Sequence, residues 1–184
     1  MNQTKRSVIL TELAKKLLAG GSWCGETHIQ KATYFIQELL GVPTEYHFIL
    51  YKHGPYSFDL HHELVDFRAA RLFRLQAMPP YGPSLVPTEV AEEIRARFPR
   101  TLKRYQRQID FVASRLAEKT VAELERIATA LYVTRKEGLR LPEDRARSIH
   151  HLKPHVSFVQ ALAAVTEIDK METAAQGLVI SNDQ

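Results

Sequence analysis

The chain has 184 residues, of which 45% are hydrophobic and 25% are charged. These values are ordinary for one globular domain with a hydrophobic core, and they exclude a fibre, a disordered chain and a disulfide-rich scaffold. The 25 Lys and Arg residues against 21 Asp and Glu residues give a net charge of +4, which permits nucleic-acid binding without implying it.

Two further features indicate a protein that stays in water. The only cysteine, Cys24, cannot form an internal disulfide or a multi-thiolate metal site, and we expect it to be a buried, inert thiol. The N-terminus leads to no apolar signal segment, and the longest apolar runs fall far short of the roughly 20 residues of a membrane span. The sequence therefore predicts a cytoplasmic protein without a membrane association.

The first 40 residues predict two amphipathic helices. Apolar residues at three- and four-residue steps favour a helix over residues 6–19, which Gly20-Gly21 ends. Thr27 and Gln30 have the spacing of a capping box at the start of a helix over residues 27–40. The arc of this second helix opposite its apolar residues carries Gln30, Lys31, Tyr34 and Glu38. We expect Lys31 and Tyr34 to lie on the surface.

A strand, a turn and a third helix follow. Residues 46–51 are aromatic and β-branched, which favours a strand, and Gly54-Pro55 predicts the turn after it. Ser57 is placed to cap a helix over residues 58–70. That helix carries two apolar stripes, Leu60/Leu64/Phe67 and Phe58/Val65/Ala69, and we expect it to be wedged between neighbouring elements.

The remaining chain is predicted to be a hairpin followed by helices. Residues 72–76 and 85–86 flank a Pro/Gly-rich stretch and resemble a short wing. Helices are expected over residues 88–97, 100–118 and 120–136, then from Pro142 to His151 and from Ser157 to about 175. The fold class is α+β, predominantly α-helical, with one domain over residues 1–176, a small winged-helix-like hairpin or sheet, and a loose tail over 177–184.

No enzyme motif is present in the sequence. Phosphate-loop, dinucleotide, serine-hydrolase and zinc-protease patterns are all missing, and His61-His62-Glu63 lacks a second ligand at the required spacing. His150, His151 and His155 form a cluster on which a metal-dependent hydrolase could be built, although Pro154 separates them. We expect these histidines to pack or to cap a helix junction, with no cofactor and no metal.

The most distinctive pattern is cationic. Between Glu93 and Asp110 no acidic residue occurs, while six cations do: Arg95, Arg97, Arg100, Lys103, Arg104 and Arg107. On a helical wheel, Arg100, Lys103, Arg104 and Arg107 lie opposite the apolar face, and Phe111 falls within the basic arc. This pattern favours either a solvated helix face or a contact with an anionic partner, in which Phe111 would be exposed.

DNA reading by the third helix is disfavoured. In a winged helix-turn-helix this helix would approach phosphates, but its arc without large apolar residues carries Asp59, Glu63 and Asp66. If DNA or RNA binds, residues 100–111 are the better candidate.

Two motifs resemble a known group of proteins. Residues 27–35, T-H-I-Q-K-A-T-Y-F, precede residues 48–57, F-I-L-Y-K-H-G-P-Y-S. This order resembles the Leu-Gln-Lys-x-x-Tyr-Phe and aromatic-x-Tyr-Gly-Pro-hydroxyl pattern of Panacea-type and YwgA-like proteins, small bacterial and phage proteins that include SocA-type antitoxins and adaptors. The resemblance covers residues 8–75. Residues 152–155, L-K-P-H, also resemble the YwgA-like group.

The resemblance implies a mostly α fold without a catalytic centre, which binds another protein such as a toxin or a phage-related protein. Lys31 and Tyr34 would then contribute to partner binding near the turn at Gly54 and Pro55. A second, electrostatic contact would come from Arg100, Lys103, Arg104, Arg107 and Phe111. We expect a non-enzymatic, antitoxin- or adaptor-like module of bacterial regulation or defence that occludes its partner. The alternatives are a DNA/RNA-binding regulator that uses the basic helix, and a metal-dependent hydrolase.

Overall fold

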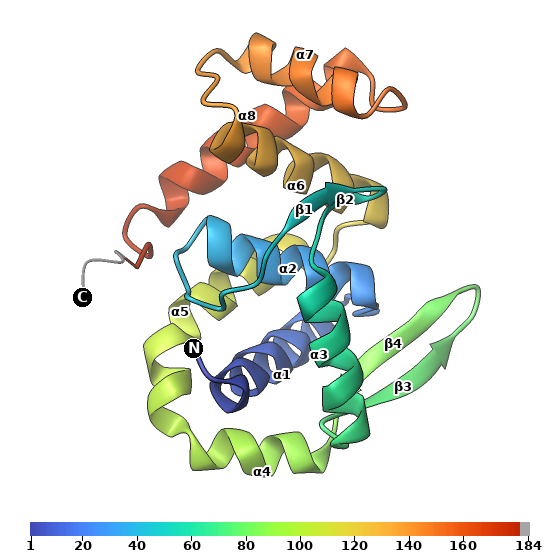
Figure 1. The fold of residues 1–184 in the computed structure, drawn as a ribbon, viewed down its shortest axis with the longest axis vertical. Coiled ribbons are helices and arrows are strands. Elements are labelled where there is room, and N and C mark those ends of the chain that lie inside the picture. The colour runs from blue at the N-terminus through green and yellow to red at the C-terminus, as the bar shows by residue number, and fades with distance from the viewer. Residues whose placement is uncertain (181–184) are drawn as a thin grey trace.

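Residues 1–180 are described by a computed structural model and form a predominantly helical α+β domain (Figure 1). Its helices are α1 (Gln3–Ala19), α2 (Glu26–Glu38), α3 (Phe58–Ala69), α4 (Glu89–Arg97), α5 (Pro99–Leu116), α6 (Val121–Lys136), α7 (Pro142–Leu152) and α8 (Phe158–Ala175). The strands are β1 (Ile49–Tyr51), β2 (Gly54–Tyr56), β3 (Phe73–Met78) and β4 (Tyr81–Pro87). The predicted fold class is confirmed.

Side-chain caps begin the helices at several predicted positions. The Ser57 hydroxyl accepts a hydrogen bond from the Leu60 N–H, as the sequence indicated. Complete capping boxes begin α6 at Thr120 and α8 at Ser157. A cap satisfies a backbone N–H that has no partner within the helix, so these starts are encoded locally.

Helix α2 lies at the centre of the domain. It packs against α1, α5, α6 and β2, while α7 and α8 form a further layer on α6 (Figure 1). As a result, every residue of α2 from His28 to Ile36 is buried, including the arc that the wheel predicted to be polar and exposed. The core continues through α1, α5, α6 and α8.

The two sheets are separate antiparallel hairpins. In the first, Ile49 pairs with Tyr56 and Tyr51 with Gly54, so Gly54 and Pro55 belong to β2 and the turn lies at residues 52–53. The prediction of a turn at Gly54-Pro55 was therefore displaced by two residues. The second hairpin, β3–β4, is the predicted wing and projects beside α3 (Figure 1).

The predicted strand over residues 46–51 begins only at Ile49. The reason is Gln37, whose side-chain amide donates to the Tyr46 carbonyl at 2.9 Å and accepts from the Tyr46 N–H at 2.9 Å. The same oxygen accepts from the Thr44 hydroxyl. Because a side chain already satisfies the Tyr46 backbone, this stretch remains an ordered loop and does not pair as a strand.

The described part of the expected tail is not loose. The Ile180 N–H donates to the Leu40 carbonyl at 2.9 Å, and the Gln108 side chain donates to the Leu178 carbonyl at 2.8 Å. Leu178 and Ile180 also pack against the core. The prediction of a loose tail from 177 was thus wrong for Leu178 and Ile180, and residues 181–184 lie outside the described chain.

Two sequence expectations concern the environment of the chain. Cys24 is buried as predicted, and this burial raises the pKa of its thiol to about 12, which keeps it protonated. Among residues 1–180, no helix combines the length and the apolar composition needed to cross a membrane.

Candidate protein-interaction surface

Gln30 fixes the junction between β2 and α3 from inside the domain. Its side-chain oxygen accepts from the Ser57 N–H, and its amide nitrogen donates to the Ser57 carbonyl, both at 2.9 Å. Gln30 and Ser57 are fully buried. The predicted capping box of Thr27 and Gln30 was therefore wrong, because Gly25 is the N-cap of α2 and Gln30 binds a distant segment instead.

Lys31 holds the same hairpin one residue further along α2. Its ammonium donates to the Pro55 carbonyl at 2.8 Å, and the residue is only 1% exposed. The prediction that Lys31 lies on the surface was wrong. The physical reason is the position of α2, since the β1–β2 hairpin and α6 cover the arc that carries Lys31.

Tyr34, the other α2 residue expected on the surface, is also buried. Its ring packs edge-on against Phe48 with 5.0 Å between ring centroids, and no protein atom in the described chain binds its hydroxyl. Burial raises the pKa of this phenol far above its usual range. Tyr34 is thus a core residue that supports the loop before β1, and the expectation of direct partner contact was wrong.

Gly54 and Pro55 are buried as well and face α6. Gly54 has φ +81, and a Cβ there would lie 3.1 Å from the Thr129 hydroxyl and 3.3 Å from the Glu125 carbonyl. Glycine is favoured at this position because another residue would be strained at this φ and its Cβ would displace the neighbouring atoms of α6. The Gly-Pro pair therefore docks the hairpin onto α6 and offers no free surface to a partner.

A second lysine holds the tip of the hairpin. The Lys153 ammonium, at the end of α7, donates to the Tyr51 carbonyl at 2.6 Å and to the Lys52 carbonyl. It also lies 3.4 Å from the buried carboxylate of Glu125 on α6. Two exposed histidines contact the same carboxylate, His155 at 3.2 Å and His53 at 3.5 Å. Sequence reasoning had assigned no role to Lys153, although the motif at residues 152–155 marked its position.

The burial of Lys31 predicts how the free energy of unfolding depends on pH. Desolvation lowers the pKa of Lys31 to about 8, with Glu125 opposing the shift and Lys153 adding to it. Between about pH 8 and 10.5 the unfolded chain holds a proton that the folded chain has lost. The contribution of Lys31 to the free energy of unfolding therefore rises across this window, by at most about 1.4 kcal/mol per pH unit.

Denaturant unfolding of the wild type and of Lys31→Met, measured from pH 7 to 10, tests this sign. The wild type should gain stability relative to the variant as the pH rises, because only the wild type loses the buried charge. The difference cancels the opposing titration of tyrosines that both proteins share. A difference that stays flat or falls with pH contradicts the assigned burial of a charged amine.

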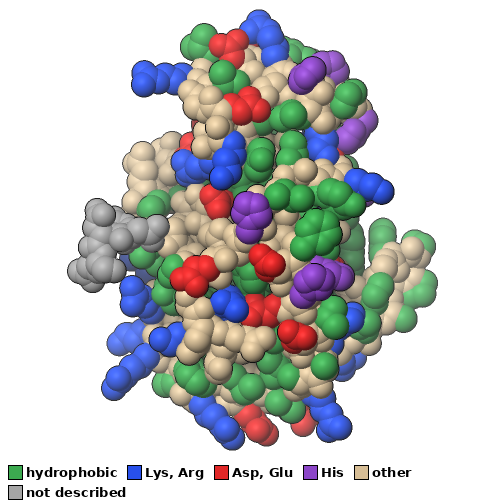
Figure 2. Space-filling model, viewed as in Figure 1, with side chains coloured by type: hydrophobic (Ala, Val, Ile, Leu, Met, Phe, Trp, Pro, Cys, Tyr) green, Lys and Arg blue, Asp and Glu red, His purple; other side chains and the backbone are tan. Residues whose placement is uncertain are grey.

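The β1–β2 hairpin, which Lys31 and Lys153 hold in place, and the start of α3 carry a group of aromatic rings at the surface. We define the aromatic patch as Ile49, Tyr51, Tyr56 and Phe58, in which Tyr51 is 45% and Phe58 is 46% exposed. The three rings lie 5.1 to 5.8 Å apart by their centroids. Figure 2 shows hydrophobic and histidine side chains gathered on the right of this face, where the hairpin and α3 lie in Figure 1.

The apolar surface continues along α3. Phe58, Val65 and Ala69, the second predicted stripe, are exposed, whereas Leu60, Leu64 and Phe67 are buried. The prediction that neighbours enclose both stripes was wrong, because only the first stripe meets other elements of the domain. The exposed stripe extends the aromatic patch down one face of α3.

Glu26 ties the edge of the patch to α2. Its carboxylate lies 2.7 Å from Nδ1 of His61 and accepts a hydrogen bond from the Tyr56 hydroxyl at 3.2 Å. Partial burial, together with the negative charge of Glu26, raises the pKa of Tyr56 to about 12. The Glu26 carboxylate therefore holds the side chains of Tyr56 and His61 in place.

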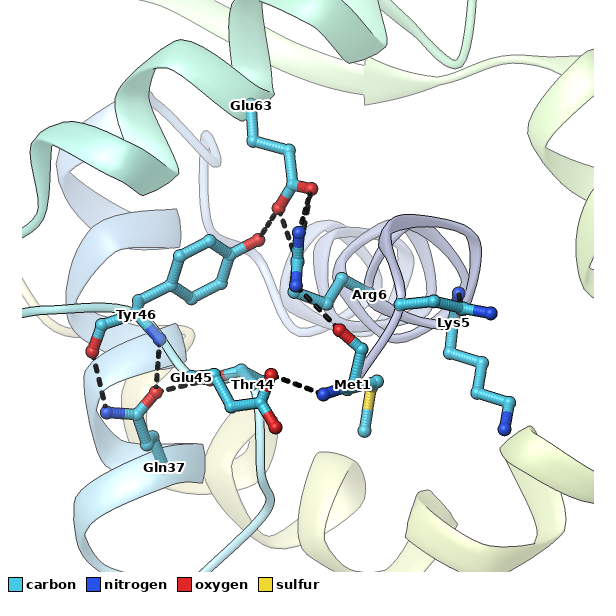
Figure 3. Close-up of polar contacts among 9 residues, drawn as sticks. Met1, Lys5, Arg6, Gln37, Thr44, Glu45, Tyr46 and Glu63 are labelled. Atoms are coloured by element: carbon cyan, nitrogen blue, oxygen red, sulfur yellow. Dashed lines mark hydrogen bonds and ion pairs between the residues drawn. The ribbon is translucent and has the colours of Figure 1, made fainter.

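An acidic cavity of about 350 Å³ lies beside α3 and the loop before β1. Glu63 is one of its lining residues, and the Glu63 carboxylate accepts three hydrogen bonds from Arg6, at 2.7, 2.9 and 3.1 Å, and one from the Tyr46 hydroxyl (Figure 3). Asp59 and Asp66 also line the cavity, and neither forms an ion pair within the described residues. The cavity thus keeps two free negative charges next to the apolar stripe of α3.

The predicted basic helix is α5, which lies on the left of Figure 1, whereas the β1–β2 hairpin lies on the right; Figure 2 shows Lys and Arg side chains along the left edge of the same face. Arg100, Lys103, Arg104 and Arg107 are exposed, as the wheel indicated. Phe111 is not an exposed aromatic residue, because it packs against the core with the Arg115 guanidinium 5.4 Å from its ring centroid.

Arg95, the first of the six predicted cations, is buried. It lies 3.4 Å from the Glu12 carboxylate and 3.3 Å from that of Glu92. Its charge is therefore neutralised inside the domain, and it does not belong to the exposed basic surface.

The three C-terminal histidines do not converge on one point. His150 binds the Val156 carbonyl through Nδ1 at 2.7 Å, His155 contacts Glu125, and His151 is exposed. Within residues 1–180 no three His, Cys, Asp or Glu side chains are grouped to hold a metal ion. The geometry therefore offers no support to the metal-dependent hydrolase alternative.

The fold and this surface define a helical α+β protein that presents a clamped aromatic hairpin. Comparison of the chain with protein-family models gives no match. Comparison with curated proteins gives none either.

Proposed function

We propose that this protein is a non-enzymatic protein-binding module, antitoxin- or adaptor-like, that acts in bacterial regulation or defence by occluding a partner protein. The resemblance at residues 27–35 and 48–57 supports this class of function. The observation that carries the proposal is the aromatic patch, whose side chains lie outside the hydrophobic core of the domain.

Large aromatic rings in a contiguous exposed cluster are characteristic of protein-binding surfaces. Tyr side chains are enriched among the residues that dominate binding energy, because they bury much area and have few rotatable bonds. In this protein the backbone below the rings is held by Gln30, Lys31 and Lys153. A partner would therefore meet a preorganised surface and would lose little entropy in ordering it.

The motif residues act indirectly in this proposal. Lys31 and Tyr34 are buried on α2, Gly54 and Pro55 are buried within the hairpin itself, and these four residues would position the aromatic patch without touching the partner. Asp59 and Asp66 add negative charge beside the apolar stripe. The partner surface that fits has an apolar anchor flanked by basic side chains.

Affinity capture from a lysate of the source organism, quantified by mass spectrometry, tests the proposal. The test variant is Tyr51→Ser/Phe58→Ser, which removes two exposed rings. The matched control is Leu141→Ser/Val159→Ser, which removes two exposed apolar residues of the α7–α8 layer. We expect the recovery of a specific partner to fall about tenfold or more with the test variant, because central aromatic residues each contribute about 1–2 kcal/mol or more.

The control variant should recover the partner as the wild type does. The same recovery with all three proteins, or an equal loss with both variants, would contradict the assignment of the patch. Circular dichroism of each variant should match the wild type, since all four substituted side chains are exposed.

A further inference from the structure

A cavity lies where α4 meets α5, and its lining shares no residue with the aromatic patch. It has a volume of about 460 Å³, which is within the range of small-ligand sites. Four cations line it: Lys5 from α1, Arg97 from the end of α4, and Arg100 and Arg104 from α5. No carboxylate contributes to its lining.

The charge of this cavity is not compensated by the protein. Lys5, Arg97, Arg100 and Arg104 are all exposed, and none forms an ion pair with any residue of the described chain. Figure 3 shows the Lys5 side chain directed away from the Arg6–Glu63 cluster. Like charges repel when they gather in one concavity, so this arrangement favours an anionic ligand.

The lining also has an apolar part. Phe98 and Tyr105 contribute rings to the wall, and the Arg104 guanidinium lies 5.5 Å from the Tyr105 ring centroid. Guanidinium groups bind phosphate oxygens in a two-pronged geometry, and aromatic rings can contact a base. Lys103 and Arg107 extend the positive charge along α5 beyond the cavity.

We propose that the α4–α5 cavity binds a phosphate-bearing ligand, with Lys5, Arg97, Arg100 and Arg104 neutralising its phosphates and Phe98 contacting its base. A phosphate concentrates more charge in this small volume than a carboxylate does, which favours phosphate over an acidic peptide. The ligand chemistry is shared by free nucleotides and by single-stranded nucleic acid. This site is independent of the proposed protein-binding surface.

Binding measurements with two probes distinguish a free nucleotide from single-stranded nucleic acid as the ligand. Calorimetry with ATP measures free-nucleotide binding, and fluorescence anisotropy of a labelled 12-nucleotide single-stranded RNA measures nucleic-acid binding, both at 50 mM salt. The test variant is Arg100→Glu/Arg104→Glu. The control is Lys136→Glu/Arg140→Glu, two exposed cations near the end of α6 without ion pairs in the described chain, which changes the net charge equally.

We expect the test variant to bind the recognised probe at least tenfold more weakly, while the control stays within about twofold of the wild type. If the RNA is recognised, its salt dependence should become shallower by about 0.7 per lost phosphate contact on a log–log plot. Binding of ATP alone identifies a nucleotide site, and binding of the RNA alone identifies a nucleic-acid site.

Three results would overturn the proposal. The first is no binding of either probe by the wild type at 50 mM salt, and the second is an equal loss with both variants. The third is displacement of the probe by poly-glutamate at the same concentration as by polyphosphate, which would assign the cavity to acidic protein segments. Thermal unfolding of both variants shows whether they remain folded, so that a loss of probe binding is not mistaken for a loss of folding.

Discussion

Replacing Gln30 by Ala is expected to lower the free energy of unfolding by about 2 kcal/mol, because the buried Ser57 N–H would lose its partner and the Ser57 carbonyl would keep only the bond from the His61 N–H. Each buried backbone group left unsatisfied costs about 1–3 kcal/mol. Ser57 is 0% exposed, so water cannot replace the lost amide without a rearrangement. Urea unfolding followed by circular dichroism measures the loss.

Two further variants sharpen this experiment. Gln76→Ala, at an exposed position on β3, should change the stability by less than about 0.5 kcal/mol. Gln30→Glu keeps an acceptor for the Ser57 N–H but cannot donate to the Ser57 carbonyl when ionised, so it should also destabilise the protein at neutral pH. A Gln30→Ala protein as stable as the wild type would show that this clamp has no energetic role.

The expected effect on function follows from the same contact. Ser57 joins β2 to α3, and both elements carry rings of the aromatic patch. When the junction loosens, the rings must be ordered at the time of binding, and this ordering weakens the complex. Gln30→Ala should thus reduce partner recovery in the capture experiment even though Gln30 cannot touch the partner.

Replacing Lys153 by Met is expected to destabilise the protein by about 2 kcal/mol, since the buried Glu125 carboxylate would keep only the two exposed histidines within ion-pair distance. Lys153 and Glu125 have side chains that are each only 8% exposed. The variant also loses the bonds to the Tyr51 and Lys52 carbonyls. Lys170→Met, at an exposed position on α8 without an ion pair in the described chain, is the matched control and should be nearly neutral.

A double-mutant cycle measures how much of the lost stability comes from the interaction between Lys153 and Glu125. If Lys153 and Glu125 are coupled, Lys153→Met/Glu125→Leu should lose less stability than the sum of the two single changes, by about 1 kcal/mol or more. Thermal or urea unfolding of the four proteins supplies the cycle. Strict additivity would contradict the coupling, and the hairpin tip would then be held by the carbonyl bonds alone.

Burial of the motif residues changes the interpretation of the resemblance. Gln30, Lys31 and Lys153 each bind backbone carbonyls near the β1–β2 hairpin, and Gly54 allows that hairpin to approach α6. The Gln, Lys and Gly residues of the motifs can therefore all be explained by one structural role, which is to hold the β1–β2 hairpin against α2 and α6. Of the residues that would meet a partner, Tyr51 belongs to the second motif and Phe58 directly follows it.

The sequence by itself determined the helices, the wing and the exposed cations of α5. Periodic apolar residues, hydroxyl caps and the Pro/Gly-rich stretch around the β3–β4 turn act through neighbours within a few positions in the chain, so they can be interpreted without knowledge of the fold. The basic arc of Arg100, Lys103, Arg104 and Arg107 was predicted for the same reason, because one side of an amphipathic helix faces solvent.

Only the tertiary structure decided which polar and apolar faces are buried. A helical wheel assumes one buried face, but other elements surround α2, so Lys31 and Tyr34 are buried. For the same reason Gln30 does not cap its own helix and binds Ser57 instead. On α3 the opposite occurs, and Phe58 and Val65 remain exposed although they are apolar. Burial depends on elements that are distant in the chain, and their positions are set by packing of the whole domain, which local patterns do not encode.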